Sequence, residues 1–145
     1  MTEFRFHHLE RRRVDEALPD LLERAYEEGL RVVVRAASEE MVGALTGRLW
    51  TYDDASFLPH GAAGDGDPGE QPIFLTAEAG NPNGASLLVR LSGAGANGTD
   101  EGFATVVLLF DGRDEDAVAE ARREWKRLKD GGRTMSYWRE AEDVP

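Results

Sequence analysis

Hydrophobic positions in the first third of the chain recur at two spacings, which predict alternating strands and helices. Residues 2–8 alternate between polar and apolar side chains, as an opening strand does, and an amphipathic helix is predicted around residues 19–28. Residues 30–36 are rich in β-branched side chains, and Ser38 is suited to cap a helix that continues to about Trp50. The order strand, helix, strand, helix is typical of a parallel α/β sheet.

The rest of the chain predicts more strands than helices. We expect one long helix at 114–130 and further strands at residues 56–59, 73–76, 86–91, 104–110 and 133–138. The run at 104–110 is the most apolar of the chain, so it is expected at the centre of the sheet. The strands between residues 51 and 102 are joined by loops too short to contain helices. We predict a mixed sheet of about seven strands with helices on both faces, a Rossmann-like three-layer α/β domain.

The composition predicts one globular domain, residues 1–145. With 145 residues, 41% of them hydrophobic and 31% charged, the chain is large enough for a core of its own. No apolar run is long enough to span a bilayer, and residues 1–8 lack the regions of an export signal. The absence of cysteine excludes disulfides, thiolate nucleophiles and sulfur-ligated metals. We expect a cytoplasmic protein without membrane contact.

Charge is distributed unevenly along the chain. The formal net charge of −11 argues against a broad nucleic-acid surface, and direct binding to DNA is expected to be weak. Residues 122–139, however, carry seven cations against Glu124 and Asp130, a net +5, which leaves −16 on the other residues. A basic strip in an acidic chain is suited to an anionic partner. Cations near a helix C-terminus are also common on solvated faces, so both interpretations stay open.

Two glycine-rich stretches lack the context of a cofactor site. Residues 93–98 match G-x-G-x-x-G, but the residues after them lead into another predicted strand and do not open a helix. Residues 61–70 lack the Gly-Lys-Ser/Thr of a phosphate loop, and Glu70 stands where a calcium loop needs glycine. We expect both stretches to be loops and predict no cofactor.

The sequence shows no convincing catalytic or metal site. His7 and His8 point to opposite faces of the predicted strand, and none of the three histidines has another at the helical spacing of metal ligands. The chain has no G-x-S-x-G motif. The cluster at residues 11–13 is flanked by acidic residues, which favours a solvated helix entry over a nucleic-acid contact. We therefore expect no catalytic residue, no metal and no enzyme activity.

Two groups of residues remain as candidate binding surfaces. The first is aromatic and apolar and follows the second predicted helix, with Trp50, Phe57, Leu58 and Pro59 as its main members. Aromatic residues in such a stretch either anchor an interface or cap the core.

The second candidate surface lies on the helix at 114–130. Arg122, Trp125 and Lys129 share a face of this helix, and Lys126 follows the indole directly. An apolar ledge beside cations is suited to a ligand with a hydrophobic end and negative charge, such as the C-terminal carboxylate of a peptide beside an aromatic residue.

Several of these segments are shared with a known family. They are the motif L-W-x5-S-F-x-P-H at residues 49–60, the glycines of residues 61–66, the R-R-E-W-K segment at 122–126, and Gly132 with a closing aromatic at Tyr137 and Trp138. In these motifs, and over nearly its whole length, the chain resembles the chi subunit of the bacterial DNA polymerase III holoenzyme.

This resemblance implies an accessory replication protein without an active site. Chi proteins look like nucleotide-binding α/β folds but lack catalysis. They join the clamp-loader assembly through the psi subunit and hold the acidic C-terminal tail of single-stranded DNA-binding protein. The resemblance therefore implies a monomer or heterodimer subunit that contacts DNA only indirectly.

The resemblance also assigns residues to the two surfaces. It implies a tail site at Arg122, Trp125 and Lys126, to which we add the nearby cations Lys129 and Arg133 as expected contacts. It implies that the psi subunit, or a helicase partner, contacts Trp50 and Phe57, and we include their neighbours Leu58 and Pro59.

Two other function classes remain open on the sequence. The basic strip is compatible with a generic interaction module for some other acidic peptide. A nucleotide-dependent enzyme on a Rossmann-like scaffold would need a glycine loop that leads into a helix.

Overall fold

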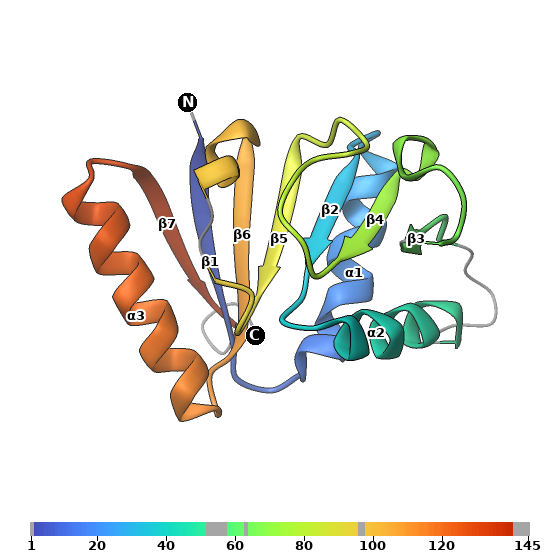
Figure 1. The fold of residues 1–145 in the computed structure, drawn as a ribbon. Coiled ribbons are helices and arrows are strands. Elements are labelled where there is room, and N and C mark those ends of the chain that lie inside the picture. Colours follow the sequence, from blue (N-terminus) through green and yellow to red (C-terminus); the bar gives the residue numbers. More distant parts are fainter. Residues whose placement is uncertain (1, 52–57, 63, 96–97, 141–145) are drawn as a thin grey trace.

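Seven strands form one sheet in the computed structural model, which describes residues 2–51, 58–62, 64–95 and 98–140 (Figure 1). The order across the sheet is β3-β4-β2-β5-β6-β1-β7. The strands are β1 (Glu3–Leu9), β2 (Val32–Arg35), β3 (Gly61–Ala62), β4 (Ile73–Thr76), β5 (Leu87–Leu91), β6 (Thr105–Asp111) and β7 (Thr134–Arg139). Strand β6 lies between β5 and β1, which confirms that the most apolar run is internal to the sheet.

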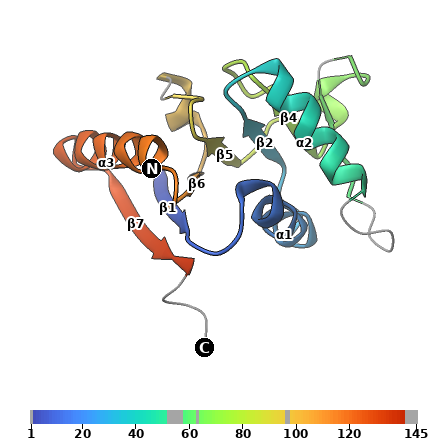
Figure 2. The ribbon, with the colours of Figure 1, turned by 90° about the horizontal axis from the view of Figure 1, so that it is seen from below.

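Three α-helices cover the two faces of the sheet, as expected for a three-layer domain. They are α1 (Val14–Glu27), α2 (Glu39–Thr51) and α3 (Glu115–Asp130), with two short 3-10 helices, η1 (Pro68–Glu70) and η2 (Gly98–Gly102). Buried side chains of α1 and α2 pack into one hydrophobic cluster, and those of α3 pack into the other. Figure 2 shows α1 and α3 on opposite sides of the sheet.

The prediction of a mixed sheet was wrong, because every described strand pair is parallel. Parallel neighbours need a crossover connection, whereas antiparallel neighbours can be joined by a short loop. In the structure, β2 lies between β4 and β5. The segment that joins β4 to β5 therefore connects two strands that are not neighbours in the sheet. Residues 92–104 join the neighbours β5 and β6, and about a dozen residues are enough for a parallel crossover without an α-helix.

Helix boundaries differ from the sequence expectation at α1. The helix begins at Val14, well before Pro19, which therefore lies inside the helix and not in its first turn. The early start is stabilised by Glu16, whose Oε1 accepts a hydrogen bond from the Arg13 backbone N–H at 2.9 Å. Ser38 caps α2 as expected, because its Oγ accepts from the Met41 N–H at 3.2 Å.

The strand expected at 56–59 falls partly outside the described residues. Positions 52–57 are not described, and Leu58 and Pro59 have no strand conformation. The edge strand of this region is instead the short β3.

The C-terminal third of the fold joins a helix to an edge strand. Asp114 caps α3, since its Oδ1 accepts from the N–H groups of Asp116 and Ala117 at 3.0 and 3.3 Å. The helix ends at Asp130 with Gly131 as its C-cap, and Gly132 follows with a φ of 70° that suits glycine. This turn returns the chain to β7, which pairs with β1 at the end of the sheet.

Candidate binding groove between α3 and β7

A groove of about 360 Å³ separates α3 from β7. It is lined by Val118, Ala121, Arg122 and Trp125 from the helix and by Tyr137 from the strand. The helical residues recur at spacings of three and four, so they lie on one side of α3. Sequence and fold therefore bring an apolar surface, two aromatic rings and one guanidinium to a single depression.

Aromatic rings form the wall and floor of this groove. The Trp125 ring meets Tyr137 edge-on at 5.7 Å and Phe6 of β1 edge-on at 5.1 Å. Phe6 is fully buried, whereas Trp125 is half-buried and Tyr137 is exposed. The edge-on geometry holds these rings in defined positions. An incoming apolar side chain therefore meets a preformed surface.

His8 fixes the position of the Tyr137 side chain. Its Nδ1 is hydrogen-bonded to the Tyr137 hydroxyl, and its ring packs on Phe110 at 5.0 Å. Burial lowers the pKa of His8, and the positive charges of Arg139 and Arg122 lower it further, against the opposing effect of Glu10. Near pH 7 this histidine is therefore neutral and acts as a fixed support for the tyrosine.

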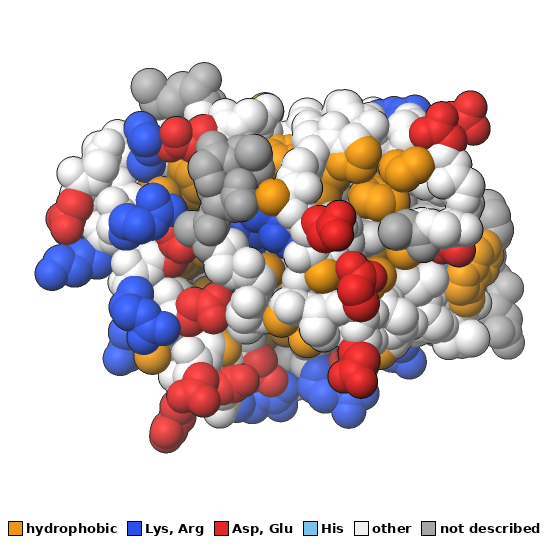
Figure 3. Space-filling view, viewed as in Figure 1, with side chains coloured by type: hydrophobic (Ala, Val, Ile, Leu, Met, Phe, Trp, Pro, Cys, Tyr) orange, Lys and Arg blue, Asp and Glu red, His pale blue; other side chains and the backbone are white. Residues whose placement is uncertain are grey.

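Free cations lie along the exposed part of α3. Arg122 lines the groove, and Lys126 and Lys129 lie one and two turns further along the helix. Within the described residues, none of these three side chains has a hydrogen-bond or ion-pair partner. Figure 3 shows Lys and Arg side chains gathered over α3, at the left of the molecule. The groove thus has positive charge at its rim that no ion pair with another described residue neutralises.

Other cations of the basic strip are already paired. Arg133 forms an ion pair with Glu101 of η2 at 2.5 Å, and both side chains are exposed. Arg127 donates to Glu124, whose carboxylate is buried. The expected tail contacts therefore differ: Arg133 is paired with Glu101, whereas Arg122, Lys126 and Lys129 have no ion-pair partner in the described ranges of the chain.

Sequence reasoning did not assign four residues that shape the groove. Val118, Ala121 and Tyr137 line it, and His8 holds the tyrosine. Tyr137 stood out only as a closing aromatic. The sequence did contain a signal for the face on which Tyr137 lies, because alternate residues of a strand such as β7 share a face. The pairing of β7 with β1, which brings Tyr137 opposite Phe6, is a long-range contact that the spacing does not contain.

The aromatic candidate surface at the end of α2 is only partly exposed. Trp50 is 56% exposed, and its ring packs on His60 at 4.6 Å. Leu58 is 3% exposed and belongs to the core cluster under α1 and α2, so its side chain is not at the surface. Pro59 is half-buried, and Phe57 lies outside the described residues.

The structure offers no metal cluster among the residues it describes, where no three His, Asp or Glu side chains are grouped suitably for an ion. In the same described parts of the chain, no helix is both long and apolar enough to cross a membrane. The described residues that follow the 93–98 glycine stretch form η2 and then β6, so no α-helix opens there.

Fold and groove together define a parallel α/β domain with an aromatic, cation-rimmed groove between its last helix and its edge strand. A family model described as DNA polymerase III chi subunit, HolC, matches residues 1–136. The chain belongs to the DNA polymerase III chi subunit family.

Individual relatives are consistent with this family. The chain is 35% identical over 92 residues to the probable DNA polymerase III subunit chi of Rickettsia prowazekii, which covers 63% of this chain and 56% of the relative. It is 31% identical over 104 residues to the DNA polymerase III subunit chi of Pseudomonas aeruginosa, covering 72% of this chain and 70% of the relative. The match to the Rickettsia protein therefore spans little more than half of that protein.

Proposed function

We propose that this protein is a non-catalytic subunit of the DNA polymerase III holoenzyme that binds the acidic C-terminal tail of single-stranded DNA-binding protein. The observation that carries this proposal is the groove between α3 and β7, which combines aromatic walls with unpaired cations. Such a site recognises a peptide end that carries an aromatic side chain and a carboxylate. Contact with DNA is then indirect, through the bound protein.

The tail's terminal phenylalanine enters the groove beside Trp125 and Tyr137. Its carboxylate pairs with Arg122 at the rim, because a guanidinium can bind a carboxylate with two parallel hydrogen bonds. Acidic residues upstream in the tail lie near Lys126 and Lys129. Arg133 contributes only if the tail displaces Glu101 from its ion pair.

Affinity should be moderate and sensitive to salt. Exposed ion pairs contribute roughly 0–1 kcal/mol each, so most of the binding free energy comes from the buried aromatic side chain. We expect a Kd in the micromolar range, about −8 kcal/mol, that weakens as added salt screens the cations.

Calorimetric titration with a tail peptide tests the site. Arg122→Ala and Lys126→Ala should each weaken binding about two- to tenfold, because each removes one charge-assisted contact at a partly exposed rim. Arg24→Ala is the matched control, since Arg24 is exposed in the last turn of α1 and lies outside the groove. No heat with the unmodified protein, or an unchanged affinity for both groove variants, would show that the site is wrong.

The same titration separates the tail site from a generic acidic-peptide module. A peptide whose terminal phenylalanine is replaced by alanine keeps its negative charge but cannot fill the aromatic part of the groove. We expect this peptide to lose most of its affinity. Equal binding of both peptides would favour the generic module.

We further propose that Trp50 contacts a second protein, the psi subunit or a helicase. An indole that is 56% exposed offers a large apolar area with little rotamer freedom to lose. Trp50→Ala should abolish co-elution with the purified partner in gel filtration and leave tail binding unchanged. Tyr26→Ala is the control, because Tyr26 is 42% exposed on α1. Co-elution that survives Trp50→Ala would exclude this contact.

A further inference from the structure

Two buried arginines lie side by side on neighbouring strands. Arg35 of β2 and Arg90 of β5 are register partners, and they are 2% and 3% exposed. Each follows a valine that packs under α1 and α2, so the alternation of a strand points both guanidinium groups to the α3 side of the sheet. Like charges directly opposite each other on adjacent strands repel, and burial increases the cost. Such a pair requires an anion.

The carboxylates of the chain satisfy these arginines only in part. Asp100 of η2 lies between them, with Oδ1 at 2.7 Å from Arg35 Nη1 and Oδ2 at 3.4 Å from Arg90 Nη1. Glu124 of α3 accepts from Arg90 Nη2 at 3.0 Å but also from Arg127. Three guanidinium groups therefore share two carboxylates.

Four buried donor atoms of the pair have no hydrogen bond within the part of the chain that the structure describes. They are Nε and Nη2 of Arg35 and Nε and Nη1 of Arg90. A buried unsatisfied donor costs about 1–3 kcal/mol, and folded proteins leave very few of them. Four in one pair of side chains therefore indicate a missing acceptor with more oxygens than a single carboxylate has.

The arginines occupy the place where parallel α/β sheets bind ligands. From β2 the chain continues through α2 towards β3 and β4, whereas from β5 it continues to β6 on the other side. The crevice between the carboxyl ends of β2 and β5 is thus the point where the connections diverge.

Loops on both sides of this crevice are close together. Gly93 follows β5 with a φ of 85°, and a Cβ added to it would lie 2.9 Å from the Cβ of Ala37. The cavity that borders Arg90 has a volume of only about 10 Å³, which admits roughly one water. The Asp100 carboxylate lies between the two guanidinium groups, so an anion that binds both of them has to take its place.

We propose that Arg35 and Arg90 form a site for a phosphate group, free or carried by a nucleotide, and that Asp100 closes this site as an internal competitor. A phosphate brings up to two negative charges and enough oxygens to accept from the donors that Asp100 leaves unpaired. Asp100 is carried by η2, which begins and ends with glycine. The site lies in the sheet and not in the α3–β7 groove, although Arg90 also contacts Glu124, which precedes Trp125 on α3.

Arginine side-chain NMR on the whole protein tests this site directly. Inorganic phosphate is titrated at constant ionic strength while the Nε–H signals of Arg35 and Arg90 are followed, with ADP and sulfate in parallel. We expect saturable shifts of both signals with phosphate. Equal affinities for phosphate and ADP would assign the site to the phosphate group alone, and tighter binding of ADP would assign it to a nucleotide.

A substitution at Asp100, the internal competitor, provides the second measurement. Asp100→Asn keeps the shape of the side chain but removes its charge, so phosphate should bind about tenfold more tightly than to the unmodified protein. Asp130→Asn, an exposed acid at the end of α3, should change nothing. Arg90→Gln should abolish the shifts at Arg35.

Two results would overturn the proposal. One is the absence of any saturable shift at Arg35 and Arg90 in the unmodified protein. The other is an Asp100→Asn protein that binds phosphate no more tightly than the Asp130→Asn control. If Asp100→Asn does not fold, the titration of the unmodified protein decides the question alone.

Discussion

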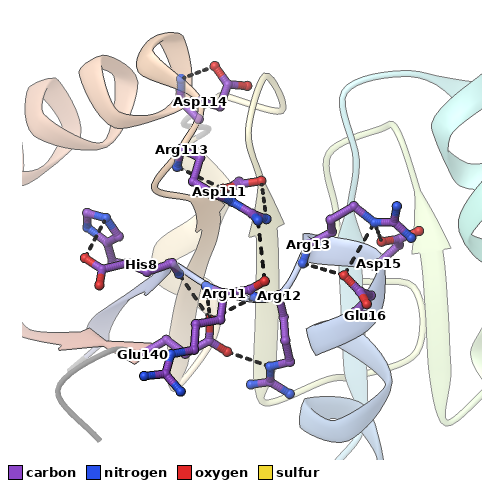
Figure 4. A network of polar contacts seen from close by, with 12 residues as sticks. His8, Arg11, Arg12, Arg13, Asp15, Glu16, Asp111, Arg113, Asp114 and Glu140 are labelled. Carbon is purple, nitrogen blue, oxygen red and sulfur yellow. Dashed lines mark hydrogen bonds and ion pairs between the residues drawn. The ribbon is translucent and has the colours of Figure 1, made fainter. Parts of the chain in front are cut away.

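Glu140 is a single carboxylate that ties the C-terminal strand to the start of α1. Its Oε1 accepts hydrogen bonds from the backbone N–H groups of Glu10, Arg11 and Arg12 at 3.1, 2.6 and 3.0 Å, and Oε2 accepts from Arg12 Nε at 2.6 Å (Figure 4). Burial by itself would raise the pKa of this carboxyl. The hydrogen bonds from Arg12 and from the backbone outweigh that effect and lower the pKa to about 2.

We expect Glu140→Gln to destabilise the protein by about 1.5–3 kcal/mol, because three backbone donors then bond to a neutral oxygen and Arg12 Nε faces an amide NH2 in place of an acceptor. Urea unfolding at pH 7, followed by circular dichroism, measures the change. Glu27→Gln is the control, since Glu27 is exposed at the end of α1, and it should stay within about 0.5 kcal/mol of the unmodified protein. An equal midpoint for both variants would contradict this role of Glu140.

At single positions, the sequence indicated which side chains could form a binding surface, but it did not indicate which of them are buried. Trp125 was expected on a face with cations, and it does line the groove beside Arg122. Glu124 looked like one more charge of a solvated helix, yet it is 8% exposed. The reason is Arg90, which lies on a strand distant in sequence and draws the carboxylate inward. Leu58 was expected at an interface, but the core under α1 and α2 takes its side chain.

At the level of elements, periodicity located most strands and helices but did not establish their direction or pairing. The run at 73–76 was predicted with the bounds that β4 has, and the long helix at 114–130 differs from α3 only by its capping residue. Parallel pairing was missed because it depends on where each crossover leads, which local spacing does not encode. The groove is a product of such pairing, since Tyr137 reaches Trp125 only because β7 lies beside β1.

For the whole molecule, buried histidines make stability depend on pH. Burial lowers the pKa of His7 from 6.5 to about 4, and the positive charge of Arg5 lowers it further. The unfolded chain therefore takes up this proton near pH 6.5, whereas the folded protein resists it until about pH 4. Folding stability falls as the pH drops through that window, by up to about 3 kcal/mol from His7. His8 acts in the same direction.

Glu140 adds a second decline at lower pH. Its pKa is about 2 when folded and 4.5 as the reference value, so its stabilisation is complete above pH 4.5 and is lost as the pH falls towards 2. The urea midpoint measured from pH 8 to pH 3 should therefore fall in two stages. His7→Gln should flatten the first stage and leave the second, and Glu140→Gln should do the reverse. A His7→Gln profile as steep as the original between pH 6.5 and 4 would contradict the assignment.

The position of β1 has a consequence for how the chain is made. β1 precedes its two neighbours in the sheet, β6 and β7, by about a hundred residues or more. Until β6 and β7 have left the ribosome, both edges of β1 are open to other chains. Nascent chains that stop before β7 should consequently be candidates for chaperone binding or aggregation.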